Sequence, residues 1–159
     1  MYNGLVFLHV FFALLLMLAH GAHAAAMLKF RGEPDPEQSL TFFSNVPDIK
    51  YVRYLYIAMG VFGFAAAIYT GWWNKGWIWA SAIIFAIISW VMYQYGAGYY
   101  SIIFDTANRL IEARKTNTNV PAVQKEFDDA RDMPNAMIVS IVGIVGLAII
   151  LWLMRFKPF

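Results

Sequence analysis

Four long apolar segments, separated by polar stretches, constrain the fold of this chain more than any other feature. The segments cover Leu5–Leu28, Tyr54–Trp72, Trp77–Tyr100 and Ala136–Leu153. Each approaches or exceeds the roughly 20 residues that a helix needs to cross a bilayer. Of the 159 residues, 60% are hydrophobic and only 14% are charged, which is typical of a membrane protein. We therefore predict an all-α fold, a four-transmembrane-helix bundle that forms a single integral membrane domain over residues 1–159.

Sequence patterns within and between the segments set the expected helix boundaries. Helices are predicted at about residues 4–29, 51–72, 77–115 and 134–155. The third helix is expected to continue past the bilayer, because a helical apolar stripe runs on beyond Tyr100. Pro121 suits the first turn of a new helix, so a short helix is predicted at about residues 121–132. The bundle thus gains a helical extension between helices 3 and 4.

The loop between the first two helices carries different signals. Residues 32–36 contain a glycine and two prolines, which is typical of a turn. The apolar run Leu40–Phe43 that follows is expected to lie on the bilayer surface.

Lysine and arginine are distributed unevenly between the two sides of the predicted bundle. The first and third loops carry nine of them: Lys29, Arg31, Lys50, Arg53, Arg109, Arg114, Lys115, Lys125 and Arg131. The termini and the second loop carry only Lys75, Arg155 and Lys157. Because cytoplasmic loops are enriched in these residues, we predict that the long loops and the helical extension are cytoplasmic and that both termini lie outside.

The first apolar segment has to be distinguished from a cleavable signal peptide. Ala22–Ala24 resembles an A-x-A cleavage site. However, residues 1–4 contain no Lys or Arg, and the apolar run is longer than a usual signal core. We expect this segment to be a retained transmembrane helix.

Several functional classes are excluded by residues that the sequence lacks. It contains no cysteine, which removes disulfides, thiolate catalysis, iron–sulfur ligation and covalent haem attachment. A net charge of +2 is too small to indicate nucleic-acid binding. The cores of the predicted spans contain no Asp, Glu, Lys or Arg, which proton-driven transport and serine-hydrolase chemistry would use. The main prediction is therefore a membrane interaction protein or accessory subunit of a larger complex, such as a respiratory or photosynthetic one, without catalysis of its own. Its predicted partners are the lipid bilayer and other membrane chains or further copies of itself.

All three histidines lie in the first apolar segment and share one helical face. An α-helix turns roughly 100° per residue, so His9 and His20 point within about 20° of each other. His23 lies about 40° from His9 and about 60° from His20. Imidazoles inside lipid are costly unless they face protein or water. Three interpretations stay open: a haem b site, a copper site, and hydrogen bonds that hold helices together.

The haem interpretation uses the first-helix histidines and one methionine, namely His9, His20, His23 and Met59. Axial ligands approach the iron from opposite faces, so two histidines of one helix cannot both bind the same haem. A His–Met pair stays open, because His20 and Met59 each lie about eight residues from the predicted cytoplasmic end of their helices. A five-coordinate histidine or a ligand from a partner chain would also suffice.

The copper interpretation uses a second set of residues from the same helix. Its ligands would be Met17, His20, His23 and Met27. These four lie within roughly 120° of arc on one helical face. Thioether and imidazole groups are suitable ligands for Cu(I).

Small residues predict where the helices touch. They include Gly21 in the first span, Gly60 and Gly63 in the second, and Gly143 and Gly146 in the fourth. Glycine lets two helix backbones approach closely in lipid. We expect backbone contacts at these positions.

Three stretches resemble a family of uncharacterised bacterial four-helix integral membrane proteins. They are residues 8–21, from Leu8-His9 to His20-Gly21, then residues 71–79, GWWNKGWIW, and residues 150–159, ILWLMRFKPF. That family is distantly similar to the copper-resistance D family and to HemJ-type protoporphyrinogen oxidases. The resemblance implies a four-helix fold and a location in the bacterial inner membrane.

The likeness to HemJ-type proteins rests on three short matches. They are Leu8-His9 near the start of the first helix, Arg131–Pro134, which resembles an Arg-x-x-Pro motif, and the terminal Lys157-Pro-Phe159. In HemJ-type proteins the first-helix histidine is associated with haem, so the resemblance implies a haem role for His9. The HemJ-type Trp-x-x-Gly of the first helix and the internal lysine have no match here. Protoporphyrinogen oxidation is therefore not implied.

Overall fold

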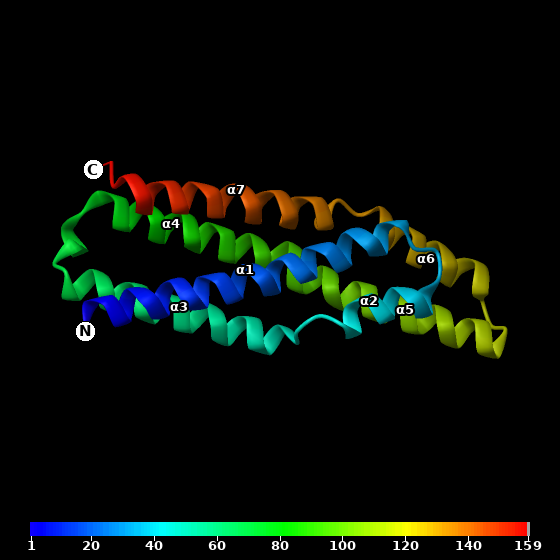
Figure 1. Ribbon diagram of the computed structural model, residues 1–159. Helices are drawn as coiled ribbons and strands as arrows, with labels where there is room; N and C mark the ends of the chain where they lie inside the picture. Colours follow the sequence, from blue (N-terminus) through cyan, green and yellow to red (C-terminus); the bar gives the residue numbers. More distant parts are fainter. Residues whose placement is uncertain (159) are drawn as a thin grey trace. The chain divides into compact units, whose positions relative to one another are not determined.

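The computed structural model describes residues 1–158, apart from the side chain of Ile49. Phe159, the last residue of the terminal motif, lies outside the described residues. The described chain is helical and contains no strand. Its elements are α1 (Tyr2–Gly32), α2 (Pro36–Ser44), α3 (Ile49–Tyr69), the 3₁₀ helix η1 (Trp72–Asn74), α4 (Gly76–Val91), the π-helix η2 (Met92–Ala97), α5 (Gly98–Thr116), α6 (Val120–Asp132) and α7 (Asn135–Phe156), shown in Figure 1.

Four helical runs are long and apolar enough to cross a membrane, which confirms the predicted all-α fold with four membrane-length helices. They cover Tyr2–Gly32, Lys50–Tyr69, Gly76–Thr116 and Val120–Phe156. The long third helix is interrupted by η2, which the sequence pattern did not indicate. Within η2, Gly96 is buried, and a Cβ there would lie 3.7 Å from the side chain of Val139. The short helix at Val120–Asp132 agrees with the predicted boundaries.

Helix α2 was not predicted, because Pro34 and Pro36 indicated only a turn, whereas Pro36 is the first residue of the helix. Its position is explained by tertiary packing. The Phe43 side chain is 2% exposed, and its ring lies 6.2 Å from the Phe30 ring and 5.2 Å from the Tyr100 ring, centroid to centroid. The expectation that residues 40–43 lie on the bilayer surface is therefore wrong for Phe43. Burial of an aromatic ring outweighs the weak helix propensity of a nine-residue segment.

The helices form two compact units, and each is described by itself. The first unit consists of Met1–Ala22, Pro47–Ile88 and Gly143–Phe159, and the second of His23–Val46 and Ser89–Val142. Helices α1, α4 and α7 contribute residues to both units.

The first unit is held together by side chains that fit into glycine positions. In this unit α1 runs antiparallel to α3, as Figure 1 shows. A Cβ on Gly63 would collide with the ring of His9, one on Gly143 with the ring of His20, and one on Gly146 with Ile88. Three predicted contact glycines are thus at helix contacts, but each one receives a side chain rather than a second backbone.

Two other glycines do not behave as predicted. A Cβ on Gly21 or on Gly60 would meet no atom within 4 Å, so the predicted close contacts at these positions are wrong. Close to Gly60, bulky side chains pack between α1 and α3. One such pair is Phe12 and Phe62, whose rings stack with 5.5 Å between centroids.

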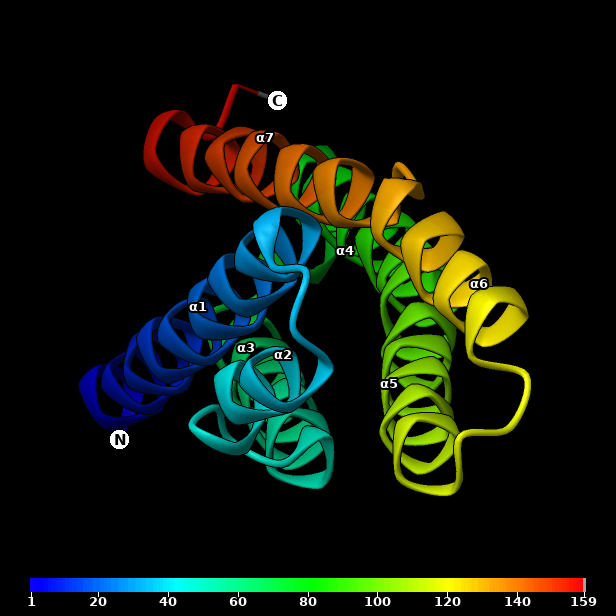
Figure 2. The ribbon, with the colours of Figure 1, turned by 90° about the vertical axis from the view of Figure 1, so that its right-hand side faces the viewer.

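The second unit has a compact aromatic core. Helices α5 and α6 lie side by side in Figure 2, and the turn between them contains Asn117 and Asn119, with φ of 52° and 51°. Asparagine tolerates this left-handed backbone better than most residues. Phe30 and Phe127 are fully buried, with 5.5 Å between their ring centroids in an edge-to-face arrangement. The Tyr99 hydroxyl donates a hydrogen bond to the carbonyl of Ala130 at 3.0 Å, which satisfies the polar tip of a buried ring.

Candidate functional site

His9 is held in one orientation by α3. Its Nδ1 atom lies 2.9 Å from the carbonyl oxygen of Met59. A carbonyl oxygen only accepts, so Nδ1 donates the hydrogen bond, and the neutral ring then has its lone pair on Nε2. Gly63 provides the space for the ring, because a Cβ there would lie 2.8 Å from both Cε1 and Nδ1 of His9. The α3 backbone therefore fixes the position and the tautomer of this imidazole.

The contacts between α1 and α7 identify a methionine at the level of His9. The ring of His20 contacts Gly143. These two helices run in opposite directions in Figure 1. His9 lies eleven residues before His20, and Met154 lies eleven residues after Gly143. In antiparallel helices these two residues lie at the same level.

A ring stack between α3 and α4 completes this level. Tyr56 and Phe85 have 4.2 Å between ring centroids, and Tyr56 also donates a hydrogen bond to the Phe85 carbonyl at 3.4 Å. Helices α3 and α4 are antiparallel, so Met59, three residues after Tyr56, lies level with Ala82, three residues before Phe85. Ala82 is next to Ser81. One imidazole, two methionines and a buried serine therefore surround the same level of the first unit.

These side chains line an apolar cavity of about 340 Å³. Along α1 the lining extends from Tyr2 to Met17, which corresponds to about 23 Å at 1.5 Å per residue. Small residues in α3, including Gly60 and Ala67, leave room for it. The cavity is thus elongated along the direction of the helices.

One end of the cavity is formed by aromatic rings and a cation. The Lys157 Nζ atom lies 3.9 Å from the centroid of the Trp72 ring and 5.7 Å from that of the Trp77 ring. The Tyr2 ring meets Trp72 edge to face at 6.1 Å. Lys157 has a φ of 49°, which turns the chain at the end of α7 and lets the ammonium group reach the indoles.

The structure changes the expected pairing of His20 with Met59. Met59 contacts His9 instead, so the depth estimate that placed it level with His20 is wrong. The reason is the register of α3. Ile49, the first residue of α3, lies ten residues before Met59. Because α1 and α3 are antiparallel, it lies level with the residue ten positions after His9, which is Ala19. Helix α3 therefore begins beside the middle of α1 rather than beside its end.

The remaining candidate ligands lie in different surroundings. In the first unit, Met17 is 39% exposed and lines the cavity, and the His20 ring packs on Gly143. In the second unit, His23 is 8% exposed with its ring 6.1 Å from the Tyr100 ring, and Met27 is buried in the apolar core. No three His, Asp or Glu side chains of residues 1–158 gather closely enough to hold a metal ion.

The haem and copper interpretations can be compared with this geometry. Histidines that bind metals commonly donate their other ring N–H to a carbonyl, as His9 does to Met59. The volume of the cavity argues against haem binding. A cavity of roughly 150 Å³ holds one benzene, and one of about 340 Å³ holds a slender or one- to two-ring ligand. A haem macrocycle is much wider and would require the helices to separate. Both ligand sets stay predictions.

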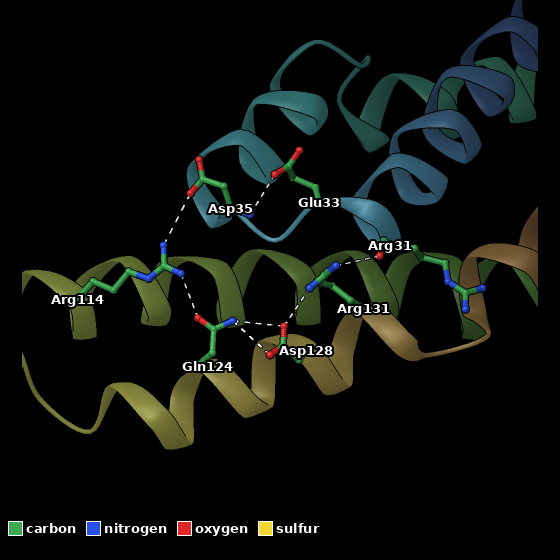
Figure 3. A network of polar contacts seen from close by, with 7 residues as sticks. All are labelled: Arg31, Glu33, Asp35, Arg114, Gln124, Asp128 and Arg131. Carbon is green, nitrogen blue, oxygen red and sulfur yellow. Dashed lines mark hydrogen bonds and ion pairs between the residues drawn. The ribbon is translucent and has the colours of Figure 1, made fainter.

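A network of polar contacts connects three helices of the second unit with the end of α1, as Figure 3 shows. Arg131 of α6 donates to the Arg31 carbonyl at the end of α1 (Nη2 to O, 3.2 Å) and to Asp128 (Nη1 to Oδ1, 3.0 Å). An arginine on the last carbonyls of a helix satisfies acceptors that the helix itself cannot. The Arg131 side chain is 19% exposed, so these bonds are partly shielded from water.

The same network continues from α6 through α5 to α2. Arg114 donates to Gln124 (Nη2 to Oε1, 3.0 Å), and Gln124 donates to both carboxylate oxygens of Asp128 at 3.3 Å. Arg114 also lies 3.8 Å from Asp35, the N-cap residue of α2. The ends of these helices are thereby fixed relative to one another within the unit.

Sequence reasoning missed Lys157, Trp72 and Ser81 as cavity residues. Lys157 was noticed only in the charge count and in the terminal motif, and Trp72 only at the end of the second apolar segment and in the GWWNKGWIW stretch. Cations close to several tryptophans at one end of the predicted bundle were the available signal. No feature of the sequence indicated Ser81 as a cavity residue, since serine is common in apolar helices.

Comparisons with protein-family models, curated proteins and solved structures gave no match to this chain.

Proposed function

We propose that the chain is a multi-pass protein of the bacterial inner membrane that acts as an interaction protein or accessory subunit of a larger membrane complex. The second unit is the observation that carries this proposal. Its aromatic core and its polar network make α2, α5 and α6 a rigid module attached to membrane-length helices. The exposed side of α6 carries charges of both signs, including Lys125, Glu126 and Asp129. Such surfaces give specificity to protein association.

The proposal includes an orientation in the membrane. The excess of Lys and Arg in the first and third loops supports a cytoplasmic second unit, with both termini outside. Single cysteines at Asn3 and Asn119 test this, because the chain has none of its own. An impermeant thiol reagent added to intact cells should label only the Asn3 site. Labelling of Asn119 alone would reverse the topology.

Site-specific photo-crosslinking in living cells tests the interaction. A photo-reactive residue at Lys125 or Asp129, both exposed on α6, should give a discrete crosslinked band of fixed mass. The same residue at Ile144, which is 69% exposed on α7, should give no protein band and serves as the control. Charge reversal by Asp129→Lys should remove the band obtained from Lys125. A monodisperse monomer with enzymatic turnover and no crosslink at α6 would contradict the proposal.

Haem b binding through His9 is the second candidate, since its Nδ1–H is held by a carbonyl and its Nε2 has a lone pair. The visible spectrum of protein purified from haem-replete cells tests this. A Soret band that disappears in His9→Ala and persists in His20→Ala would support it. A colourless folded preparation would reject it.

A further inference from the structure

We propose that the first unit binds a long-chain fatty acid, with its alkyl chain in the apolar cavity beside α1 and its carboxylate at Lys157. This binding activity goes beyond the interaction function proposed above. It rests on the shape of the cavity, on the position of charge along it, and on the hydrogen bonds already made by its polar lining.

The shape of the cavity fits a single alkyl chain. A volume of about 340 Å³ spread over about 23 Å gives a mean cross-section of about 15 Å². The volume and the length together match one extended hydrocarbon chain. A planar ring system would leave most of this length unfilled.

The charge at one end of the cavity favours an anionic head group. Lys75, Arg155 and Lys157 belong to the turn after α3 and to the end of α7. The first unit contains one acidic residue, Asp48, and it lies at the opposite end of α3. Among the residues that the structure describes in this unit, Lys157 makes no ion pair, and its ammonium group rests on indole faces. A carboxylate would supply the missing counter-charge.

The polar groups deeper in the cavity would not hold a carboxylate. The Ser81 hydroxyl donates to the Trp77 carbonyl at 2.8 Å, and the His9 Nδ1–H donates to the Met59 carbonyl. Both donors are therefore used within the protein, and Nε2 of His9 offers a lone pair that would repel an anion. Among the described residues that line the cavity, Lys157 is the only Lys or Arg. The carboxylate thus belongs at the Lys157 end and the chain in the interior.

A displacement assay on the full chain in detergent tests the head-group contact. The probes are hexadecanoate and its methyl ester, competing with a fluorescent fatty acid. Wild type should bind hexadecanoate about tenfold more tightly than the ester, since a charge-assisted contact is lost in the ester. Lys157→Gln should abolish this preference. Lys75→Gln is the matched control, because it removes the same charge from a residue that does not line the cavity, and it should keep the preference.

A plug placed in the cavity tests the position of the chain. Gly60 lines the cavity, and a Cβ there meets no atom within 4 Å, so Gly60→Phe fills the interior without a backbone clash. Gly60 lies about 9 Å along the helices from the level of Tyr2, which leaves room for octanoate but not for hexadecanoate. The variant should weaken hexadecanoate binding by at least about a hundredfold and leave octanoate binding little changed. Val61→Phe adds the same ring at a position 57% exposed on the outer surface, and it should bind both acids like wild type.

Several results would overturn the proposal. Equal binding of acid and ester, unchanged binding in Lys157→Gln, or wild-type hexadecanoate affinity in Gly60→Phe would each do so. Tight binding of a lysophospholipid with no binding of hexadecanoate would also reject it, because the ligand would then be a single-chain phospholipid and not a free fatty acid. Lys157 is exposed at the end of a helix, so its variant should fold and keep the test decisive even if the plug variant fails to fold.

Discussion

Within the two units, the helices pack against one another in different ways. In the first unit, three side chains fit into glycine positions, and an elongated cavity is left between the helices. In the second unit, aromatic rings fill the core, and charged side chains tie the helix ends together. With the first unit in lipid and the second in water, as proposed above, the surrounding solvent would account for this difference. Lipid tails are as apolar as the side chains, so a membrane helix loses little when it stands apart from its neighbour, whereas water expels an unfilled apolar surface.

Removing a core ring from the second unit should have the largest effect. Phe127 is fully buried against Phe30, so Phe127→Ala should cost about 3–5 kcal/mol of unfolding free energy. Amide hydrogen exchange should become faster in α5 and α6 and stay unchanged in α3. Phe7→Ala, at a 65% exposed position of the first unit, is the control and should leave exchange unaltered. Loss of protection in both units together would show that the two units do not differ in stability.

The glycine contacts of the first unit can be broken by a single methyl group. Gly63→Ala should cost about 1–3 kcal/mol, because its Cβ would lie 2.8 Å from the His9 ring. Gly60→Ala has open space and should be neutral, or stabilising by up to about 1 kcal/mol, since alanine is the better helix former. Thermal unfolding in detergent measures both. The double variant His9→Ala with Gly63→Ala should recover part of the loss, and a purely additive result would contradict the contact.

The polar network of the second unit should contribute a smaller amount. Arg131→Met removes the side-chain donor to the Arg31 carbonyl and one of the two donors to Asp128 Oδ1, at a cost of about 1–2 kcal/mol. Hydrogen exchange at the last turn of α1 should report the loss. Arg109→Met is the comparison, because its 2.7 Å ion pair with Glu126 is half exposed and should be worth less than about 1 kcal/mol. An equal effect of both substitutions would mean that the network adds nothing beyond surface charge.

The smallest effect concerns the start of α3. The backbone N–H of Lys50 donates to Asp48 at 2.9 Å, and this bond, with the Lys50 charge, holds the pKa of the Asp48 carboxyl below its usual value of 3.8. The carboxylate therefore stabilises the helix start fully above pH 3.8, and this contribution is lost as the pH falls through the lowered pKa. Amide exchange near Tyr51 should show fraying at low pH. Asp48→Asn should remove the pH dependence, and persistence of that dependence would assign it to another group.

The functional site shows which contacts could be predicted from the sequence and which could not. Helical periodicity placed the three histidines on one face of a membrane helix, because that geometry needs no partner. It could not give the register of α3 against α1, so Met59 was assigned to His20 although it contacts His9. Gly63 and Gly143 were recognised as contact positions, but the side chains that fill them were not. The residues around Lys157 come from both ends of the chain and from a turn, and no local pattern connects them.

By itself, the sequence determined the helical class, the number of membrane-length helices and the short helix at Val120–Asp132, because apolar length, periodicity and a proline act within a single segment. Only the tertiary structure decided that Pro36–Ser44 is a helix, which glycines receive a side chain, and that a cavity ends at Lys157. Each of these depends on the distance between segments that are remote in the chain. That distance is set by the combined packing of many side chains, which no single stretch of sequence specifies.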